Sequence, residues 1–106
     1  SALTSLKSFM LHSDITLVNS NSFITIAYFT WKQSEFSSFA PGKLIFNTSG
    51  MIDLKFTDGI TDYISGSFSG FCSQLMSSNP VADTILMIQV KKNSSSEQIK
   101  GISLIF

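Results

Sequence analysis

Apolar and polar side chains alternate most regularly in residues 51–71. In the first half of this stretch every second position is apolar, which is the period of a strand with one buried and one solvent-exposed face. The turn pair Asp58-Gly59 follows, and a second alternating segment then runs back. The pattern therefore predicts a β-hairpin with an apolar inner face. Its expected core residues are Ile52, Leu54, Phe56, Ile60, Ile64 and Phe68.

The register of this hairpin is predicted from the faces of its strands. Side chains that pair across two strands point to the same face of the sheet. A loop over residues 57–59 pairs Phe56 with Ile60 and Ile52 with Ile64, and its glycine adopts the left-handed conformation. A loop of Asp58-Gly59 alone would set the polar face of one strand against the apolar face of the other. We therefore expect the longer loop.

Further strands are predicted where β-branched, aromatic or alternating segments lie between polar turns. They cover residues 15–18, 23–31, 43–46, 84–92 and 98–106. Residues 1–11 fit either a helical turn or an entering strand. About eight strands with short connections and no convincing helix predict an all-β fold in a single domain, residues 1–106. The expected architecture is an antiparallel two-sheet sandwich with Greek-key or jelly-roll connections, and a closed barrel is the alternative.

Three further expectations concern the strands and their connections. Residues 23–31 are apolar at both parities, which indicates a strand in the middle of the sheet or one covered by a partner subunit. Residues 47–50 are expected to turn the preceding strand into the hairpin. Gly66 and Gly70 share the parity of the buried hairpin positions and leave gaps, so a neighbouring backbone or ring is expected to approach there.

Three aromatic residues are candidates for contact with a partner or receptor: Trp31, Phe36 and Phe39. The two phenylalanines lie in residues 32–40, which are otherwise polar. Loop phenylalanines either pack beneath their loop as local core or form a contact surface for another chain or ligand. Tyr28 and Trp31 are also candidates for stacking against a sugar.

The composition narrows the classes of function. A hydrophobic content of 43% excludes intrinsic disorder, and only 13% of residues are charged. Seven basic and seven acidic residues cancel, so there is no basic field of the kind that attracts nucleic acid. Weak charge is typical of a domain within an oligomer or larger assembly, although an ordinary monomer remains an alternative. No apolar run approaches the roughly 20 residues of a membrane helix, so we expect no membrane insertion.

Candidate catalytic residues are sparse, and we expect no enzyme activity. His12 is the only histidine and Cys72 the only cysteine, so a catalytic triad or a thiol nucleophile would have to use them. A surface histidine and a small buried hydrophobe are the simpler interpretations. One histidine and one cysteine cannot complete a structural zinc site, and no cofactor motif appears.

The acidic and asparagine residues also have simple interpretations. Asp53, Asp58 and Asp62 lack the spacing of a calcium loop, and Asp58 is explained by its turn. We therefore expect no metal site. Asn47 and Asn93 match the glycosylation acceptor pattern, which serine-rich sequence produces frequently by chance.

Residues 43–46, 84–90 and 101–106 are apolar strands of a disulfide-free domain that is poor in charge and ends on an apolar hairpin. In these features the chain resembles the head domain of an adenovirus fibre. The absence of arginine and the excess of Ile, Phe, Asn, Ser and Lys indicate AT-rich coding, which in that family points to the atadenoviruses. No specific motif of the family is present.

The resemblance implies a C-terminal head of a longer viral protein. Such a head is a compact homotrimer of antiparallel sandwiches at the virion surface, and it binds a host cell-surface receptor, protein or glycan, through loops or the trimer flank. The competing hypothesis is a monomeric β-sandwich module, extracellular or on a cell surface, that binds carbohydrate or a small apolar ligand.

Overall fold

The computed structural model describes residues 7–17, 20–92 and 98–106, and nearly all of its regular structure is β-strand. Expectations for Val18 and for residues 1–6 lie outside the described residues. The elements follow one another as β1 (Ser8–His12), β2 (Ile15–Thr16), β3 (Ile24–Trp31), α1 (Gln33–Phe36), β4 (Lys43–Thr57), β5 (Asp62–Leu75), β6 (Thr84–Lys91) and β7 (Gln98–Ile105).

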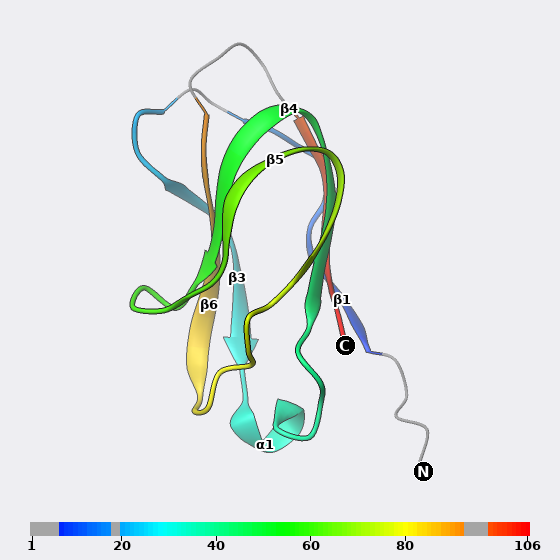
Figure 1. Cartoon of the computed structure of the whole chain (residues 1–106), viewed down its shortest axis with the longest axis vertical. Coiled ribbons are helices and arrows are strands. Elements are labelled where there is room, and N and C mark those ends of the chain that lie inside the picture. Colours follow the sequence, from blue (N-terminus) through cyan, green and yellow to red (C-terminus); the bar gives the residue numbers. More distant parts are fainter. Residues whose placement is uncertain (1–6, 18–19, 93–97) are drawn as a thin grey trace.

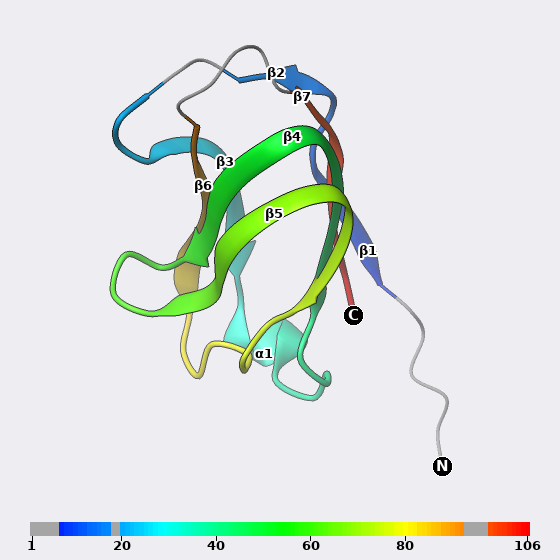
Figure 2. The same ribbon diagram turned by 45° about the horizontal axis from the view of Figure 1, so that its top comes forward.

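The described strands form one antiparallel sheet organised around β4 (Figure 1). The strand order is β1-β7-β4-β6-β3, with β2 added beside β7 and β5 beside β4. One side of β4 is shared, because Lys43 to Thr48 pair with β7 whereas Asp53 to Thr57 pair with β6. The other side pairs with β5 along most of its length. The β4–β5 pair therefore arches over and joins a β1–β7 half to a β6–β3 half (Figure 2).

This arrangement confirms the all-β antiparallel class. The sheet curves until it is nearly barrel-shaped, and hydrogen bonding continues from one half to the other through β4. The strands thus do not separate into two independently hydrogen-bonded sheets. The single helix of the described residues, α1, has four residues and lies in the segment that was expected to be a polar loop.

Residues 47–50 do not form the expected turn. They continue β4, in which even-numbered positions are buried before, within and after this segment: Leu44, Phe46, Thr48, Ile52, Leu54 and Phe56. The pairing with β5 shifts between Thr48 and Ile52, so the extra residues form an irregularity of β4 instead of ending the strand. The hydroxyl of Thr48 donates to the carbonyl of Gly50 at 2.9 Å, which satisfies a buried polar side chain at the bend.

The hairpin is present, but its register differs from the expected one. Phe56 pairs with Ile64 and Ile52 pairs with Phe68, so the apolar faces match as predicted. The expected partner of Phe56, Ile60, is instead 95% exposed and lies outside the core. Gly59 has the expected left-handed conformation, with a φ of 94°.

Side-chain hydrogen bonds explain the longer loop. The Asp58 carboxylate accepts the N–H groups of Ile60 and Thr61 at 2.8 and 2.6 Å. The hydroxyl of Thr57 accepts the N–H of Gly59 at 3.0 Å and donates to the carbonyl of Thr61 at 3.0 Å. These bonds close a turn that ends at Thr61, so the return strand begins two residues later than expected.

The strand over residues 23–31 was expected in the middle of the sheet, and this was wrong. As β3 it lies at the end of the strand order and pairs only with β6. Trp31 and Ala27 face the core, whereas Tyr28 on the opposite face is 66% exposed. The other interpretation of its apolar faces, a strand covered by a partner subunit, stays a prediction.

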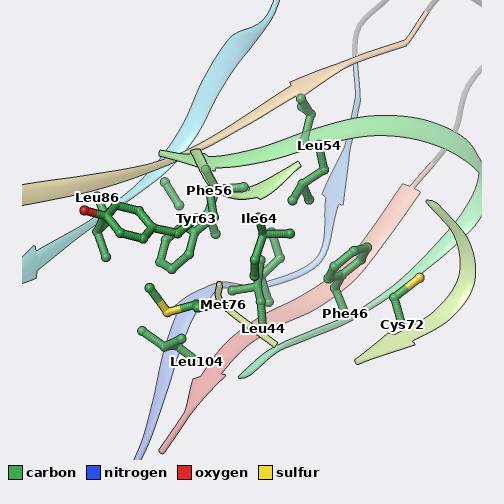
Figure 3. Close-up of a cluster of buried hydrophobic side chains, with 14 of the residues drawn as sticks. Leu44, Phe46, Leu54, Phe56, Tyr63, Ile64, Cys72, Met76, Leu86 and Leu104 are labelled. Carbon is green, nitrogen blue, oxygen red and sulfur yellow. The ribbon is translucent and has the colours of Figure 1, made fainter. Parts of the chain in front are cut away.

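The core lies between the two halves and beneath the β4–β5 arch (Figure 3). Leu54 and Phe56 of β4 and Ile64 of β5 point into it, and Met76, from the segment after β5, is buried in the same cluster. Within the described residues no helix has the length and apolarity needed to cross a membrane.

The contrast between Leu54 and Ile60 gives a direct test of the fold. Leu54→Ala should lower the free energy of unfolding by about 2–5 kcal/mol, because it leaves a cavity at a fully buried position. Ile60→Ala, the control at an exposed position, should change it by less than about 0.5 kcal/mol. Urea denaturation of both variants measures these differences. A large loss in the Ile60 variant would instead support the register with Ile60 in the core.

Candidate binding surface

The candidate contact residues meet in an aromatic cluster at the end of the molecule where α1 lies. The rings of Trp31 and Phe36 have centroids 4.8 Å apart, and Phe39 lies 5.4 Å from Phe106. Phe36 stacks on Phe106 at 5.3 Å. Trp31 is fully buried and its indole N–H donates to the Gln33 side chain at 3.0 Å. Trp31 and Phe36 thus pack as local core, and only Phe39 is partly exposed.

Asn79 fixes the loop that carries Phe39. Its side-chain amide donates to the carbonyls of Phe39 and Ala40 at 3.0 and 3.1 Å, and its side-chain oxygen accepts the N–H of Gly42 at 3.2 Å. Residues 72–83 were expected to form only a connection, but β5 continues to Leu75 and Asn79 stabilises the 39–42 loop. No local sequence pattern indicated this role, because the partners are about 40 positions apart.

The residues considered for catalysis do not come together. His12 is on β1 and Cys72 on β5, with β7 and β4 between them. The Nδ1 atom of His12 lies 2.8 Å from the carbonyl of Ser13. Burial raises the pKa of the Cys72 thiol, which lies near the carbonyls of Ser69 and Gly70, so burial opposes formation of a thiolate nucleophile.

The three aspartates of the hairpin have separate environments. Asp53 accepts a hydrogen bond from the Ser67 hydroxyl, and its carboxylate lies 3.9 Å from the Lys91 ammonium. Asp58 belongs to the turn, as expected, and Asp62 is exposed at the start of β5. Within residues 7–17, 20–92 and 98–106, no three His, Cys, Asp or Glu side chains are placed to share a metal ion.

The glycosylation candidates stay untested. Asn47 is exposed on β4, paired with Phe71 of β5 and Lys100 of β7. Asn93 lies outside the described residues.

Several exposed apolar side chains lie on the outer face of the β1–β7 half. Two rows of residues cross four strands there. One row contains Met10, Ser103, Ile45 and Ser73, and the next contains Ser8, Ile105, Lys43 and Leu75. Paired residues project to the same face of a sheet. Both rows are on the outer face, because the residues that alternate with them, such as Leu44 and Leu104, are buried on the inner face. We call this surface, together with Phe71, the apolar outer face.

Exposure and charge set the apolar outer face apart. The side chains of Met10, Phe71 and Leu75 are 73%, 72% and 58% exposed. The two rows carry one lysine and no acidic residue, and serines fill the remaining positions. Contiguous exposed apolar patches mark contact surfaces, whereas single exposed apolar side chains are ordinary. The candidate site is therefore the outer face of a sheet.

A second, smaller apolar group lies on the outer face of the other half. Tyr28 pairs with Met87, and Thr30 pairs with Ile85. Tyr28 and Ile85 are 66% and 54% exposed. The sequence singled out Tyr28 as a stacking residue, whereas no local pattern marked Met10, Phe71 or Leu75, because their common face depends on the pairing of distant strands.

Comparisons of the chain with protein-family models, with curated proteins and with solved structures give no match. A proposal about function therefore starts from the chain's own surfaces.

The Asp58 turn makes stability depend on pH. Backbone hydrogen bonds from Thr61 and Ile60 lower the pKa of the Asp58 carboxyl. The ionised carboxylate therefore stabilises the fold above the pKa of an unfolded aspartate, about 3.9, and this stabilisation is lost as the pH falls through the lower folded-state pKa. Asp58→Asn should be less stable than the wild type at neutral pH, and the difference should shrink in acid. Denaturant titrations across this pH range measure it.

Asp62→Asn is the matched control, because it removes the same charge from an exposed position of the same hairpin. Its unfolding curve should keep the acid dependence of the wild type. A stability difference between Asp58→Asn and wild type that stays constant at every pH would contradict the role of the Asp58 carboxylate.

Proposed function

We propose that this chain is a non-enzymatic attachment domain, the receptor-binding head of a viral fibre, and that it acts as a homotrimer at the virion surface. The observation that carries the proposal is the apolar outer face, which exposes Met10, Phe71 and Leu75 together on a chain of zero net charge. A face of this kind on a weakly charged protein favours association over a free surface. In the proposed trimer each copy buries this face against the other copies.

The architecture supports this interpretation. The β1–β7 half and the β6–β3 half lie on opposite sides of the core, as the two layers of a sandwich would, with the β4–β5 arch joining them. We propose that the head is of the two-sheet, Greek-key kind, with the arch as a strand pair shared by both layers. Because one half supplies the trimer contact, the other half and the loops remain available for a receptor.

A monomeric module that binds carbohydrate is the second candidate. It is favoured by Tyr28, whose ring is exposed on the β6–β3 half. Sugars stack on exposed aromatic rings, and Trp31 cannot contribute in this structure because it is fully buried. This alternative predicts a single copy in solution and a positive glycan array that a Tyr28→Ser variant abolishes.

The trimer is tested by charges placed on the apolar outer face. Met10→Glu with Leu75→Glu should reduce the copy number in solution by a factor of three, because each interface would bury uncompensated carboxylates. Sedimentation equilibrium at micromolar concentration measures the mass as a multiple of 11.6 kDa. The matched control, Tyr28→Glu with Ile85→Glu, adds the same charges to the other outer face and should keep the wild-type mass.

Attachment itself is tested with labelled wild-type chain on cultured cells. Saturable binding that unlabelled chain displaces is the expected result, and the face variant should bind more weakly because it loses multivalency. A wild-type copy number that is not a multiple of three would overturn the trimer. Absence of saturable binding on every cell type tested would count against the receptor-binding role.

A further inference from the structure

The outer edge of β5 is not paired with any strand of the described chain. β5 pairs with β4 alone, and Figures 1 and 2 show no strand along its other side. Along this edge Ser65, Ser67, Ser69 and Phe71 are exposed. An edge strand directs alternate backbone N–H and C=O groups away from its neighbour, and these groups can pair with another strand.

This edge also lacks the usual protection against pairing. No charged residue occurs in residues 63–82, and the first proline after β5 is Pro80. Irregularities occur in all three outer strands: the register of β1 shifts after Met10 and that of β3 after Thr25, and β5 has one extra residue, Tyr63, near its base. At the bend of the arch the extra residues belong to β4, and Gly70 of β5 has a left-handed conformation with a φ of 73°.

The sequence of β5 is symmetric about Phe68. Serines 67 and 69 flank this residue, and glycines 66 and 70 flank the serines. Ile64 and Cys72, one position further out on each side than Ser65 and Phe71, are both buried. A two-fold symmetric contact requires a surface that is complementary to itself, and an antiparallel strand with this symmetry meets that requirement.

We propose that the edge of β5 pairs antiparallel with the β5 edge of a second copy of this chain, with the two-fold axis at Phe68. In this register Ser67 of one copy lies opposite Ser69 of the other, and Gly66 lies opposite Gly70. Ile64 lies opposite Cys72 of the second copy, so inner faces adjoin inner faces. The pairing joins the two apolar cores and faces no charge with a like charge.

The curvature of β5 suits this two-fold pairing. β5 follows the arch, and its base is tied by the N–H of Ser77, which donates to the carbonyl of Tyr63 at 2.9 Å. A two-fold axis through the top of the arch sets two such arches side by side with opposite chain directions. Phe68, which is partly exposed and packs at 5.6 Å on Phe46, would meet Phe68 of the second copy beneath the joined arches.

This contact is closed, because each copy uses its β5 edge once and the pair leaves none free for further growth. It does not rest on the proposed function. A three-fold assembly cannot set the same edge of each chain against itself, so the trimer uses a different surface. The edge pairing therefore predicts an even number of copies, which is six if both contacts form and two if only the edge pairs.

Charged substitutions at Ser67 and Ser69 test the pairing. Ser67→Lys with Ser69→Lys places like charges opposite each other twice across the two-fold axis, and it should halve the copy number and weaken association by at least about tenfold. Ser67→Lys with Ser69→Glu places opposite charges in the same positions and should keep the wild-type copy number. Both variants share the Ser67→Lys change, so both lose the hydrogen bond from Ser67 to Asp53 and they differ only at position 69. Circular dichroism with thermal unfolding confirms that each is folded.

The copy number of the wild-type protein in solution, obtained from its mass, is the first result of the test. Two or six copies support the pairing, whereas one or three copies overturn it. Equal dissociation of both double variants would also overturn it, because the register would then play no part. Failure of the Met10 and Leu75 variant to change the mass bears only on the trimer, so the two proposals fail independently.

Discussion

The fold depends on the continuous alternation of β4. Its even-numbered residues stay on the buried face from Leu44 to Phe56, although the strand bends and its pairing with β5 shifts in between. Because the alternation is maintained, one strand can pair with β7 at its start and with β6 at its end. The two halves of the sheet therefore face each other across a common core. The bond from Thr48 to Gly50 stabilises the irregular segment that makes the bend possible.

Periodicity predicted the hairpin well because burial acts on alternate residues. Ile52, Leu54, Phe56 and Ile64 are buried as expected, and the faces of the two strands agree. The loop could not be predicted from periodicity, because its length is fixed by side-chain hydrogen bonds from Asp58 and Thr57. These bonds shift the return strand by an even number of positions relative to β4. The shift replaced Ile60 with Ile64 as the partner of Phe56, and the same face of β5 stayed buried.

The surfaces were less predictable than the core, since they depend on strands that are far apart in sequence. Trp31 and Phe36 are buried because Phe106, from the last strand segment, packs against both of them. No local pattern indicates that partner. Likewise, Met10 and Leu75 share one face only because β7 and β4 lie between their strands. The local pattern shows which residues can be buried, and the topology decides which remain exposed together.

Because this chain carries little charge, both its exposed strand edge and its apolar outer face favour association with other copies. A protein with no net charge and an apolar sheet face lacks the repulsion that keeps monomers apart. An unprotected strand edge adds an open-ended route to aggregation. The proposed symmetric contacts would remove both hazards, because a closed ring would bury the face and a two-fold pair would occupy the edge. Serine and glycine along β5 are then consistent with a pairing edge, since small uncharged side chains allow a second backbone to approach.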